Sequence, residues 1–491
     1  MFEIITPEKA GISSLTVKKF LETLERRGLV MHSVLLMRGD NIFSENYWAP
    51  FDKDFCHRMY SQTKSFVGVA IGILEGEGKL SISDTVASYF PERINRNLPE
   101  YLSALTIRDM LTMETAGEHE FWLLNENAKD RVQWYFDNNS STHPGGTIWK
   151  YDSEGSQVLS VLVEKVSGMP LFEFLNDRIF KHLGTFKTAY TLKVRNDDTF
   201  GDSSMICTTR DMASFARFVM NKGKIGEKQI APESYMTEAI KPLVDNNNSG
   251  FINSAADGYG YQIWAARDGG FAFHGMGSQF TICYPEKNFL FTCTGDNQGF
   301  GAAEDLIFSA VFELLVDNLS DSSLPENEKD YKELLDYSSG LKLAVQKGVK
   351  HTPFADEVGG KVFKANENPM GITSFSLKFD GDEGEFKFTN KQGDKVIRFG
   401  LGKNVFDKFP EYGYSDIHAG NKTTDGFLYD AASSAAWTEE KKLLLNVKII
   451  DKYFGNISMI FSFKDDKVVL DMAKHAEVFL EEYNGQLVAT R

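Results

Sequence analysis

The stretch RMYSQTKSFVGVAIGIL, residues 58–74, places Ser61 three positions before Lys64 and directly ahead of a long apolar run. Residues three apart on a helix share a face, so the lysine ammonium can lie beside the serine hydroxyl. A helix N-terminus also presents free backbone N–H groups and a dipole that favour developing negative charge. The stretch is therefore either a helix cap followed by a solvated lysine, or a nucleophilic serine with its base one turn away.

The context of this motif decides how much weight it has. A nucleophilic serine needs an adjacent base, and a lysine can serve where burial disfavours its charged form. The S-x-x-K spacing alone is weak, because Ser339-Gly340-Leu341-Lys342 matches it as well. That second match has no apolar helix behind it, whereas Ser61 follows predicted strands and precedes a predicted buried helix. Ser61 is therefore the better candidate.

The composition is that of a globular protein. The chain has 491 residues, too many for one ordinary core, so two domains are expected. Its net charge of −16 argues against nucleic acid or an anionic membrane as a main partner. No apolar run has the length that a transmembrane segment needs.

Two features favour a cytoplasmic location. The N-terminal MFEIITPEKAGISS lacks a basic segment followed by an apolar one, so no signal peptide is seen, although a processed mature chain would look the same. The cysteines are few and show no C-x-x-C spacing, which favours reduced thiols: Cys56, Cys207, Cys283 and Cys293.

Residues 1–318 have the pattern of a sheet surrounded by helices. A helix is predicted over residues 15–28, and a hairpin follows, made of HSVLLM and NIFSENYW. Two strands are predicted in FAFHGMGSQFTICYPEKNFLFTCTG, residues 271–295, with an apolar helix after them. Helical patterns dominate in between. We therefore expect one sheet that joins both ends of this domain, and a helical lobe formed by its middle.

The sequence pattern changes after residue 318. Residues 319–345 contain a polar, proline-containing stretch that predicts a linker, and a helix is predicted after it. Residues 346–491 carry short strands separated by turn residues, among them GITSFSLKF, KLLLNVKII and ISMIFSF. This pattern predicts a C-terminal all-β domain, either a small barrel or a sandwich.

Two downstream motifs could complete a site around Ser61. In PGGTIWKYDSEG, a phenol at Tyr151 would lose its proton more easily beside an ammonium, and Ser153 could donate a hydrogen bond. In FHGMGSQF, glycines within a strand indicate close approach of a ligand or backbone, and His274 could contact a substrate. The alternatives are a packed loop tyrosine with Ser153 as a helix cap, and a β-bulge with an exposed histidine.

Taken in order, SQTK, then YDS, then FHGMG resemble the motifs of the serine β-lactamase-related superfamily. This group includes class C β-lactamases, penicillin-binding DD-peptidases, D-aminopeptidases, esterases and amide hydrolases. The flanking LTIRDMLTMETAG, SSMICTTRDMASFARFVMNKGKIGEKQI and GYGYQIW also resemble stretches of those proteins. The resemblance extends over residues 5–316. It implies an α+β fold, with an antiparallel sheet flanked by helices and a helical lobe.

The resemblance implies a role for each candidate residue. Ser61 becomes the acylating nucleophile, Lys64 its partner base, and Tyr151 the general base or acid. The third motif aligns either as His274-Gly275-Met276 or as Phe273-His274-Gly275. We prefer the second alignment, in which the Met276 N–H joins the Ser61 N–H in binding an oxyanion. The lysine and the Tyr-Ala-Asn triplet of true β-lactamases are absent, which argues against efficient β-lactam hydrolysis.

The implied activity is hydrolysis of an ester or amide bond, peptide-like or containing a D-amino acid, through an acyl-enzyme. The enzyme would be of the carboxylesterase, D-aminopeptidase or DD-carboxypeptidase type, acting on a small molecule or short peptide without metal or cofactor. The alternative is a slowly deacylating penicilloyl-binding, sensor or scaffold protein. The C-terminal domain resembles the lipocalin-like barrels of some relatives, which could cover the site or support a homo-oligomer.

Other hydrolase chemistries find no matching motif in the sequence. There is no G-x-S-x-G for an α/β-hydrolase and no H-E-x-x-H for a zinc protease. GDEGE resembles the start of a calcium loop, but Lys391 stands where the loop's final glutamate belongs. We expect a hairpin turn there.

Overall fold

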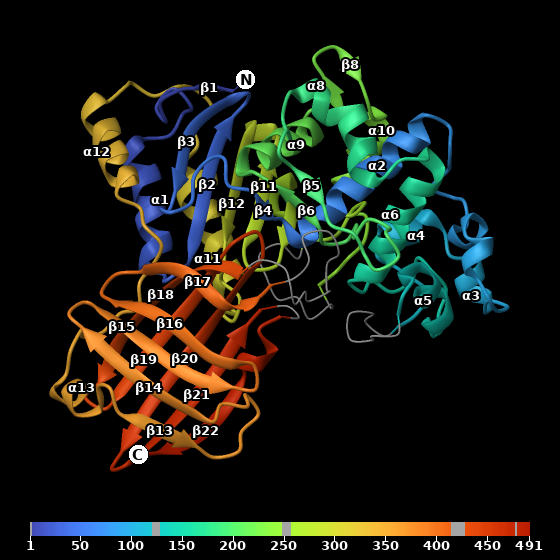
Figure 1. The fold of residues 1–491 in the computed structure, drawn as a ribbon. Coiled ribbons are helices and arrows are strands. Elements are labelled where there is room, and N and C mark those ends of the chain that lie inside the picture. Colours follow the sequence, from blue (N-terminus) through green and yellow to red (C-terminus); the bar gives the residue numbers. More distant parts are fainter. Residues whose placement is uncertain (1, 120–127, 248–256, 414–427, 477–478) are drawn as a thin grey trace. The chain divides into compact units, whose positions relative to one another are not determined.

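The structure is a computed structural model that describes residues 2–119, 128–247, 257–413, 428–476 and 479–491. They form two compact units, one ending at Lys342 and one beginning at Leu343 (Figure 1). Nearly all of segment 319–345 belongs to the first unit, where α12 (Glu328–Ser339) packs on α1 (Ser14–Arg26). Every candidate site residue lies in the first unit.

The first unit is built on a sheet that brings its two ends together. In the described chain the strand order is β1 (Glu3–Ile4), β3 (Asn41–Tyr47), β2 (Met31–Arg38), β12 (Phe289–Gly295), β11 (Gln279–Tyr284), β10 (Gly270–Gly275) and β9 (Trp264–Ala266). Val34 on β2 stands opposite Cys293 on β12, which confirms the predicted joining of the two ends. Neighbouring strands are antiparallel, apart from the parallel edge pair β1 and β3.

The prediction of two strands in residues 271–295 was wrong, because the structure has three. β10 ends at Gly275, β11 begins at Gln279, and β12 follows a turn at Pro285–Lys287. Between β10 and β11 the chain reverses through Gly277 and Ser278, whose φ angles are +78° and +79°. Glycine adopts this left-handed region at little steric cost, so GMGS forms a tight turn between two strands.

Helices cover both faces of this sheet (Figure 1), and the strand side chains divide between two cores. On β2, Val34 and Leu36 join the core beneath α1 and α11 (Ala303–Ala310). Leu35 and Met37 join the other core, together with α9 (Thr209–Met220). Successive side chains of a strand point to opposite faces, so the uninterrupted apolar run VLLM fits a strand that is buried on both sides.

The helical lobe has α2 (Thr63–Gly76) at its centre, packed on α6 (Ser153–Ser167). Residues 63–74 are all buried, which explains why the apolar run has no polar face. The first unit's other helices are α3 (Glu100–Ser103), α4 (Ile107–Leu111), α5 (Arg131–Asn138), α7 (Leu171–Leu175), α8 (Lys181–Leu183) and α10 (Glu233–Ala239). Its short outlying strands are β4 (His57–Arg58), β5 (Tyr190–Thr191), β6 (Met205–Cys207), β7 (Lys224–Ile225) and β8 (Lys228–Gln229).

A row of glycines lets neighbouring segments approach α2 closely. Gly68, Gly72 and Gly76 recur at every fourth position and so share one face of the helix. A Cβ at Gly68 would stand 2.6 Å from the backbone oxygen of Tyr261, and one at Gly72 would overlap the Tyr235 ring. The Tyr235 hydroxyl donates a hydrogen bond of 2.7 Å to the Gly68 carbonyl. These contacts fix the helix whose N-terminal end carries Ser61 and Lys64.

The second unit is a closed barrel. Its described strands follow the order β16 (Gly393–Leu401), β15 (Glu383–Asn390), β14 (Ser374–Asp380), β13 (Val362–Ala365), β22 (Gly485–Thr490), β21 (Lys467–His475), β20 (Phe454–Lys464), β19 (Lys442–Ile450) and β18 (Leu428–Glu439). β18 pairs with β16 and closes the ring, while β17 (Val405–Tyr412) pairs with β18 beside it. The helix α13 (Pro353–Val358) precedes β13. Of the two predicted alternatives, the barrel is correct, and GDEGE spans a hairpin turn as expected.

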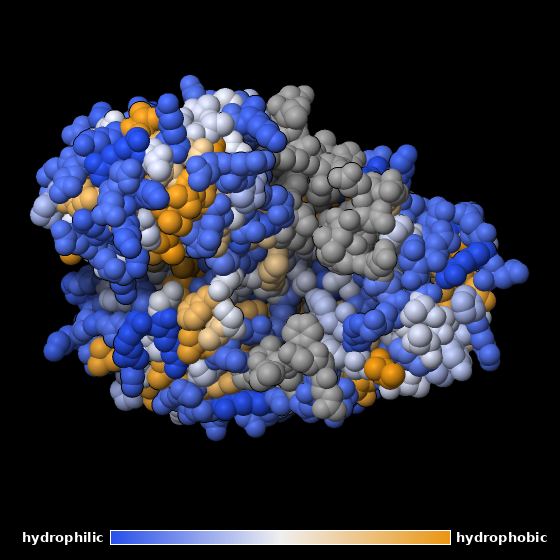
Figure 2. Space-filling model, turned by 90° about the horizontal axis from the view of Figure 1, so that it is seen from below, coloured by the Kyte–Doolittle hydropathy of each residue, from blue (hydrophilic) through white to orange (hydrophobic). Residues whose placement is uncertain are grey.

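One face of the molecule is mostly polar. Hydrophilic residues dominate the face drawn in Figure 2, where apolar residues appear in small scattered groups. Single exposed apolar side chains are normal on a globular protein. None of the described helices is both long and apolar enough to span a membrane.

The cysteines are free thiols, as the sequence predicted. Cys283 and Cys293 lie on the neighbouring strands β11 and β12, but they stand opposite Leu290 and Phe280 respectively. Both are fully buried, so they act as packing residues in the sheet.

The close packing of α2 can be tested by one substitution, because helix propensity and packing predict opposite changes in stability. Helix propensity alone predicts that Gly68→Ala stabilises the helix by about 1 kcal/mol. The contact with the Tyr261 backbone predicts the opposite, a loss of about 1–3 kcal/mol, because backbone cannot move aside as a flexible side chain can. Urea denaturation of Gly68→Ala should therefore show a lower midpoint than the native chain.

Gly340→Ala is the matched control for that substitution. Gly340 follows α12, and its nearest neighbour atom stands at an ordinary 3.4 Å from the added Cβ. Its denaturation midpoint should stay at or above the native value. A Gly68→Ala chain as stable as the control would show that the glycine row on α2 is not needed for packing.

Candidate active site

Ser61 lies in a short turn that leads into α2, and the residue before it, Tyr60, has a strained backbone conformation. The 3₁₀ turn η1 (Tyr60–Gln62) leads directly into the helix, and Tyr60 has a φ of +48°. Non-glycine residues rarely adopt this region, and such strain persists only where surrounding contacts hold it. Thr63 supplies one such contact, because its hydroxyl donates a 2.6 Å hydrogen bond to the Tyr60 carbonyl. The Arg58 guanidinium supplies another, 4.5 Å from the centre of the Tyr60 ring.

The Ser61 hydroxyl does not cap the helix. Gln62 is the N-cap residue of α2, and no side chain caps that end. The Ser61 Oγ accepts a hydrogen bond of 3.0 Å from Lys64 Nζ instead, as the three-residue spacing predicts. Of the two interpretations of the stretch, the structure supports the one in which serine and lysine face each other.

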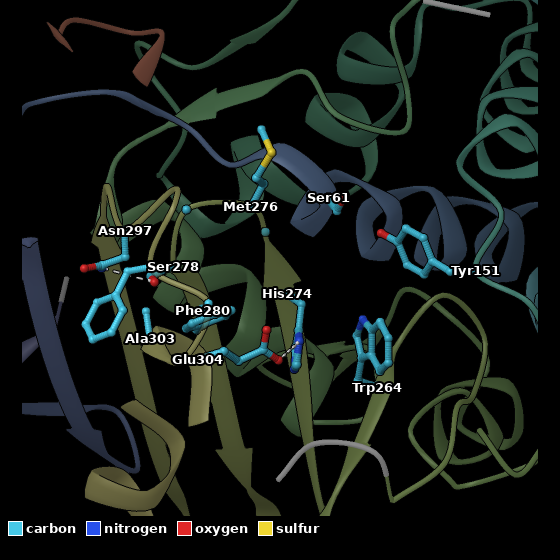
Figure 3. A pocket seen from close by; sticks show the side chains of 14 residues that line it. Ser61, Tyr151, Trp264, His274, Met276, Ser278, Phe280, Asn297, Ala303 and Glu304 are labelled. Atoms are coloured by element: carbon cyan, nitrogen blue, oxygen red, sulfur yellow. Dashed lines mark hydrogen bonds and ion pairs between the residues drawn. The ribbon is translucent and has the colours of Figure 1, made fainter. Parts of the chain in front are cut away.

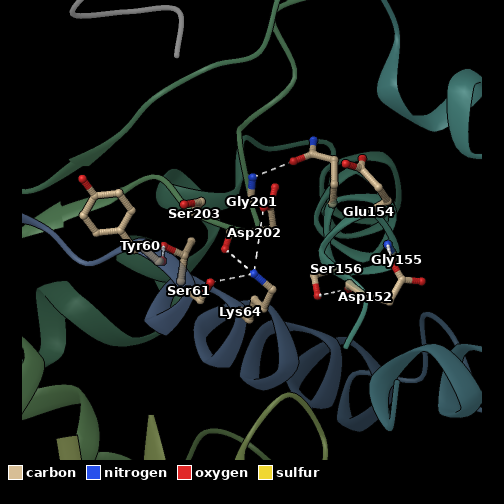
Figure 4. A network of polar contacts seen from close by, with 12 residues as sticks. Tyr60, Ser61, Lys64, Asp152, Glu154, Gly155, Ser156, Gly201, Asp202 and Ser203 are labelled. Atoms are coloured by element: carbon tan, nitrogen blue, oxygen red, sulfur yellow. Dashed lines mark hydrogen bonds and ion pairs between the residues drawn. The ribbon is translucent and has the colours of Figure 1, made fainter. Parts of the chain in front are cut away.

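Lys64 is held in place behind Ser61 (Figure 4). Its side chain is 2% exposed, and Nζ also donates a 2.8 Å hydrogen bond to the backbone carbonyl of Asp202. The Asp202 carboxylate stands 3.9 Å from Nζ. A buried ammonium needs such partners, because burial without them is costly. Asp202 is therefore a site residue, although the sequence reasoning did not single it out.

A buried ion network lies behind Asp202. Arg131 on α5 bonds the Asp202 carboxylate at 2.6 Å and the Glu154 carboxylate at 2.9 Å, and all three side chains are buried. Burial raises the pKa of Glu154 to about 7, against the opposing effect of the Arg131 charge. This network connects the loop that holds Lys64 to α5 and α6. No motif in the sequence marks it, since isolated charged residues are usually exposed.

Tyr151 lies on the cavity wall with its hydroxyl directed toward Ser61 (Figure 3). Lys64 Nζ is 5.0 Å from the centre of its ring, so the three predicted catalytic residues are brought together. The ring stacks on Trp264 with a centroid distance of 5.8 Å and an interplanar angle of 24°. Trp264, on β9, was not among the predicted site residues, although it ends the quoted segment GYGYQIW.

Ser153 lies two positions after Tyr151, at the start of α6, and its predicted contact with substrate stays a prediction. It is the first residue of α6, and the side chain that caps this helix belongs to Asp152, which accepts a 2.8 Å hydrogen bond from the Gly155 N–H. Ser153 is not among the described residues that line the cavity. His119 stands 2.9 Å from the Asp152 carboxylate; this contact lowers the pKa of Asp152, although burial opposes the shift. In the YDS segment, therefore, Tyr151 lines the cavity and Asp152 caps α6.

The third motif brings β10 against the turn that carries Ser61. A Cβ at Gly275 would overlap the backbone oxygen of Met59, so only glycine allows this approach. Met276 is the first residue beyond β10, and its carbonyl accepts a 3.1 Å hydrogen bond from the Gln279 amide. Its side chain is on the cavity wall. The backbone at Gly275 and Met276 thus borders the segment that leads into Ser61.

Five of the candidate residues line a cavity of about 360 Å³ (Figure 3), namely Ser61, Tyr151, His274, Gly275 and Met276. His274 is buried in that wall rather than exposed, with its ring 4.8 Å from Trp264 and nearly parallel to it. Its Nδ1 is 3.0 Å from the Glu304 carboxylate on α11. Glu304 was not predicted either, because nothing in its local sequence indicates that α11 borders the cavity.

The second S-x-x-K match has no comparable geometry. Ser339 is the last residue of α12, is exposed, and donates its hydroxyl to the Asp336 carbonyl at 2.8 Å. Lys342 lies beyond the helix end, so the pair does not share a helical face. In the part of the chain that the structure describes, no cluster of three or more histidine, cysteine or acidic residues is arranged to hold a metal ion.

Comparison with known proteins adds relatives of recorded activity. The chain is 23% identical over 281 residues to a 6-aminohexanoate-dimer hydrolase of Paenarthrobacter ureafaciens, a match that covers 54% of this chain and 64% of the hydrolase. It is 29% identical over 135 residues to PbpX of Bacillus subtilis, a proposed penicillin-binding protein, covering 26% and 32% of the two chains. The chain thus spans less than two thirds of the curated relatives it matches.

A solved structure shares the fold, and a family model identifies the family. A Bacillus anthracis protein, proposed to be a 6-aminohexanoate-dimer hydrolase, superposes with a TM-score of 0.53 at 18% identity, over 66% of this chain and 89% of its own. The Beta-lactamase family model matches residues 16–311, a span that contains every candidate site residue. Because this span is more than half of the 491 residues, the chain belongs to the beta-lactamase family.

Proposed function

We propose that this protein is a serine hydrolase that cleaves an ester or amide bond through an acyl-enzyme on Ser61. The observation that supports this most is the 3.0 Å hydrogen bond between Lys64 Nζ and Ser61 Oγ at the wall of a cavity. A serine and its base within hydrogen-bond reach, beside a space for substrate, are the minimum that nucleophilic catalysis needs.

In the first half of the reaction the Ser61 oxygen attacks the substrate carbonyl carbon. Its proton passes to the Lys64–Tyr151 pair: Lys64 Nζ is hydrogen-bonded to the Ser61 hydroxyl, and the Tyr151 hydroxyl is directed toward Ser61. The backbone N–H groups of Ser61 and Met276 would bind the oxyanion, an interaction worth about 3–4 kcal/mol for each donor. Tyr151 then gives a proton to the leaving amine or alcohol as the carbonyl bond to it breaks, which leaves an acylated serine.

In the second half a water molecule attacks the acyl carbon, and the same pair takes its proton. The acid product leaves and Ser61 regains its hydrogen. Because Lys64 keeps its Asp202 partners throughout, it can return to the same position in each cycle. The scheme uses no metal or cofactor.

The substrate that we propose is a small molecule or a short peptide. The cavity of about 360 Å³ is at the small end of typical ligand pockets. The 6-aminohexanoate-dimer hydrolase relative supports an amide or ester of modest size. Efficient β-lactam hydrolysis is not proposed, since YDS replaces Tyr-Ala-Asn and the third motif has His274 rather than lysine.

The first test is the substitution Ser61→Ala. Removing the nucleophile should lower kcat/KM for p-nitrophenyl esters or D-amino-acid p-nitroanilides at least about a thousandfold, as in other serine hydrolases. Ser339→Ala is the matched control, because it alters the second S-x-x-K serine and should leave activity unchanged. Equal hydrolysis by the native chain and Ser61→Ala would refute the proposal. A stable acyl adduct on Ser61 without turnover, seen by mass spectrometry, would identify a slowly deacylating binder instead.

The second test is Tyr151→Phe, which removes the hydroxyl and keeps the ring stacked on Trp264. A lost proton carrier should reduce kcat about 10²–10⁴-fold. The melting temperature should change little, because the phenyl ring preserves the packing. Steady-state kinetics and thermal unfolding of the same preparation check both points. An unchanged kcat would remove Tyr151 from the mechanism.

A further inference from the structure

We propose that Arg131 is a positioning residue for the reaction at Ser61, because it draws the Asp202 carboxylate away from Lys64 and so lets the lysine act as a base. This inference rests on the proposed function, since it concerns the base of the same site. It follows from three features of the buried network: the acceptors that Lys64 uses, the partner of the Asp202 carboxylate, and the separate support of the backbone at Asp202.

Both hydrogen bonds that Lys64 makes within the described residues go to uncharged acceptors. Nζ is 3.0 Å from Ser61 Oγ and 2.8 Å from the backbone oxygen of Asp202 (Figure 4). The Asp202 carboxylate stands at 3.9 Å, beyond hydrogen-bond distance. A neutral amine fits this arrangement, because it donates to the carbonyl while its lone pair accepts the Ser61 proton. A carboxylate bonded directly to Nζ would instead favour the charged form, which has no lone pair to accept a proton.

The Asp202 carboxylate is bonded to Arg131 rather than to the lysine. The distance from Arg131 Nη1 to Asp202 Oδ1 is 2.6 Å, and both side chains are buried. Charge-assisted hydrogen bonds of this length are strong, and the planar guanidinium ion is well suited to a buried ion pair. Arg131 therefore offsets the negative charge beside Lys64 and holds the carboxylate beyond bonding reach of the amine.

The position of the Asp202 carbonyl does not depend on Arg131 alone. The Gln157 side chain on α6 accepts a 2.9 Å hydrogen bond from the Gly201 N–H and donates one of 2.8 Å to the Thr199 carbonyl. Gln157 is fully buried. Because α6 holds the backbone ahead of Asp202 in this way, the loss of Arg131 would free the carboxylate while the carbonyl keeps its place.

Other charged and titratable side chains surround this network from the neighbouring elements. Glu154 on α6 bonds Arg131 at 2.9 Å, and burial raises the pKa of Glu154 to about 7, so it carries a proton part of the time near neutral pH. Arg131 then still has the Asp202 charge to balance. Among the described carboxylates, Asp202 is the one within ion-pair distance of Lys64 Nζ. The remaining groups are Tyr151 beside Lys64, Arg58 bonded to the Ser203 backbone, and His119 bonded to Asp152.

The test is the pH dependence of p-nitrophenyl butyrate hydrolysis by Arg131→Met, with hydrolysis by Ser61→Ala subtracted at each pH. The acidic limb of kcat/KM reports the protonation of the catalytic base in the free enzyme. With the guanidinium gone, the Asp202 carboxylate can bond Lys64, so the limb should move to higher pH by about one unit. Above the limb, kcat/KM should approach the native value. A lower kcat/KM at every pH with an unmoved limb would overturn the proposal.

Two further variants keep the test decisive if Arg131→Met does not fold. Asp202→Asn removes the carboxylate but keeps the backbone carbonyl, so the Arg131 charge should move the limb to lower pH by at least about half a unit. In the double variant Arg131→Met/Asp202→Asn neither charge is present, and the limb should return close to its native position. An Asp202→Asn profile that coincides with the native one would overturn the proposal.

Arg93→Met is the matched control. Arg93 forms the same kind of ion pair with Asp198, four positions ahead of Asp202. Neither residue is among the hydrogen-bond or ion-pair partners of Lys64 in the described chain. Breaking this pair should loosen the same segment and leave the acidic limb where it is. A limb that moves equally in Arg93→Met and Arg131→Met would reflect general loosening of the segment and would overturn the proposal.

Phosphonylation of Ser61 separates this inference from the proposed function. A fluorophosphonate reacts once with an activated serine, so its rate, followed by intact mass at each pH, needs no turnover. If the native chain shows no Ser61-dependent hydrolysis but the labelling rates show these shifts, the proposed function fails and the role of Arg131 stands. If hydrolysis depends on Ser61 but neither substitution moves the limb, the role of Arg131 fails alone. A Ser61 that is neither acylated nor phosphonylated at any pH would overturn both.

Discussion

The hydrogen bond between Lys64 and Ser61 depends on the Lys64 side chain, which is buried but has polar partners. Lys64 is anchored by the backbone carbonyl of Asp202, which lies 138 positions further along the chain. Asp202 is in turn held by Arg131, and Arg131 by Glu154. Removing one partner of such a network leaves another charge buried without compensation, which is why these contacts act as a unit. The position of Lys64 beside Ser61 is thus set by the folded lobe and not by the S-x-x-K spacing alone.

The sequence predicts those parts of the molecule whose structure follows from short-range patterns. The apolar run after Ser61 predicted α2, and its context distinguished Ser61 from Ser339, whose lysine lies past the end of α12. Tyr151 was placed near Lys64 by the order of the motifs, and the structure brings them together. The catalytic roles of these residues stay predictions, since geometry shows proximity and not turnover.

What the sequence could not predict depends on contacts between distant segments. The stretch AASSAAW, residues 431–437, has little intrinsic preference for strands, yet it belongs to β18, where pairing with β19 and β16 closes the barrel. Trp264 on β9 and Glu304 on α11 both line the cavity because each packs against His274 on β10. The alternative that Ser153 caps α6 was wrong, because the capping side chain is that of Asp152 beside it.

The pairing of β2 with β12 has a consequence for how the chain is made. Both are inner strands of the sheet, and residues 34 and 293 stand opposite each other. During synthesis the β2–β3 hairpin leaves the ribosome long before its partner strand exists, and a hairpin alone is at best marginally stable in water. Until β12 is made, the apolar edge of β2 stays unpaired, which makes the nascent chain a candidate for chaperone binding. The pairing of strands so far apart in the sequence also gives the first unit a high contact order.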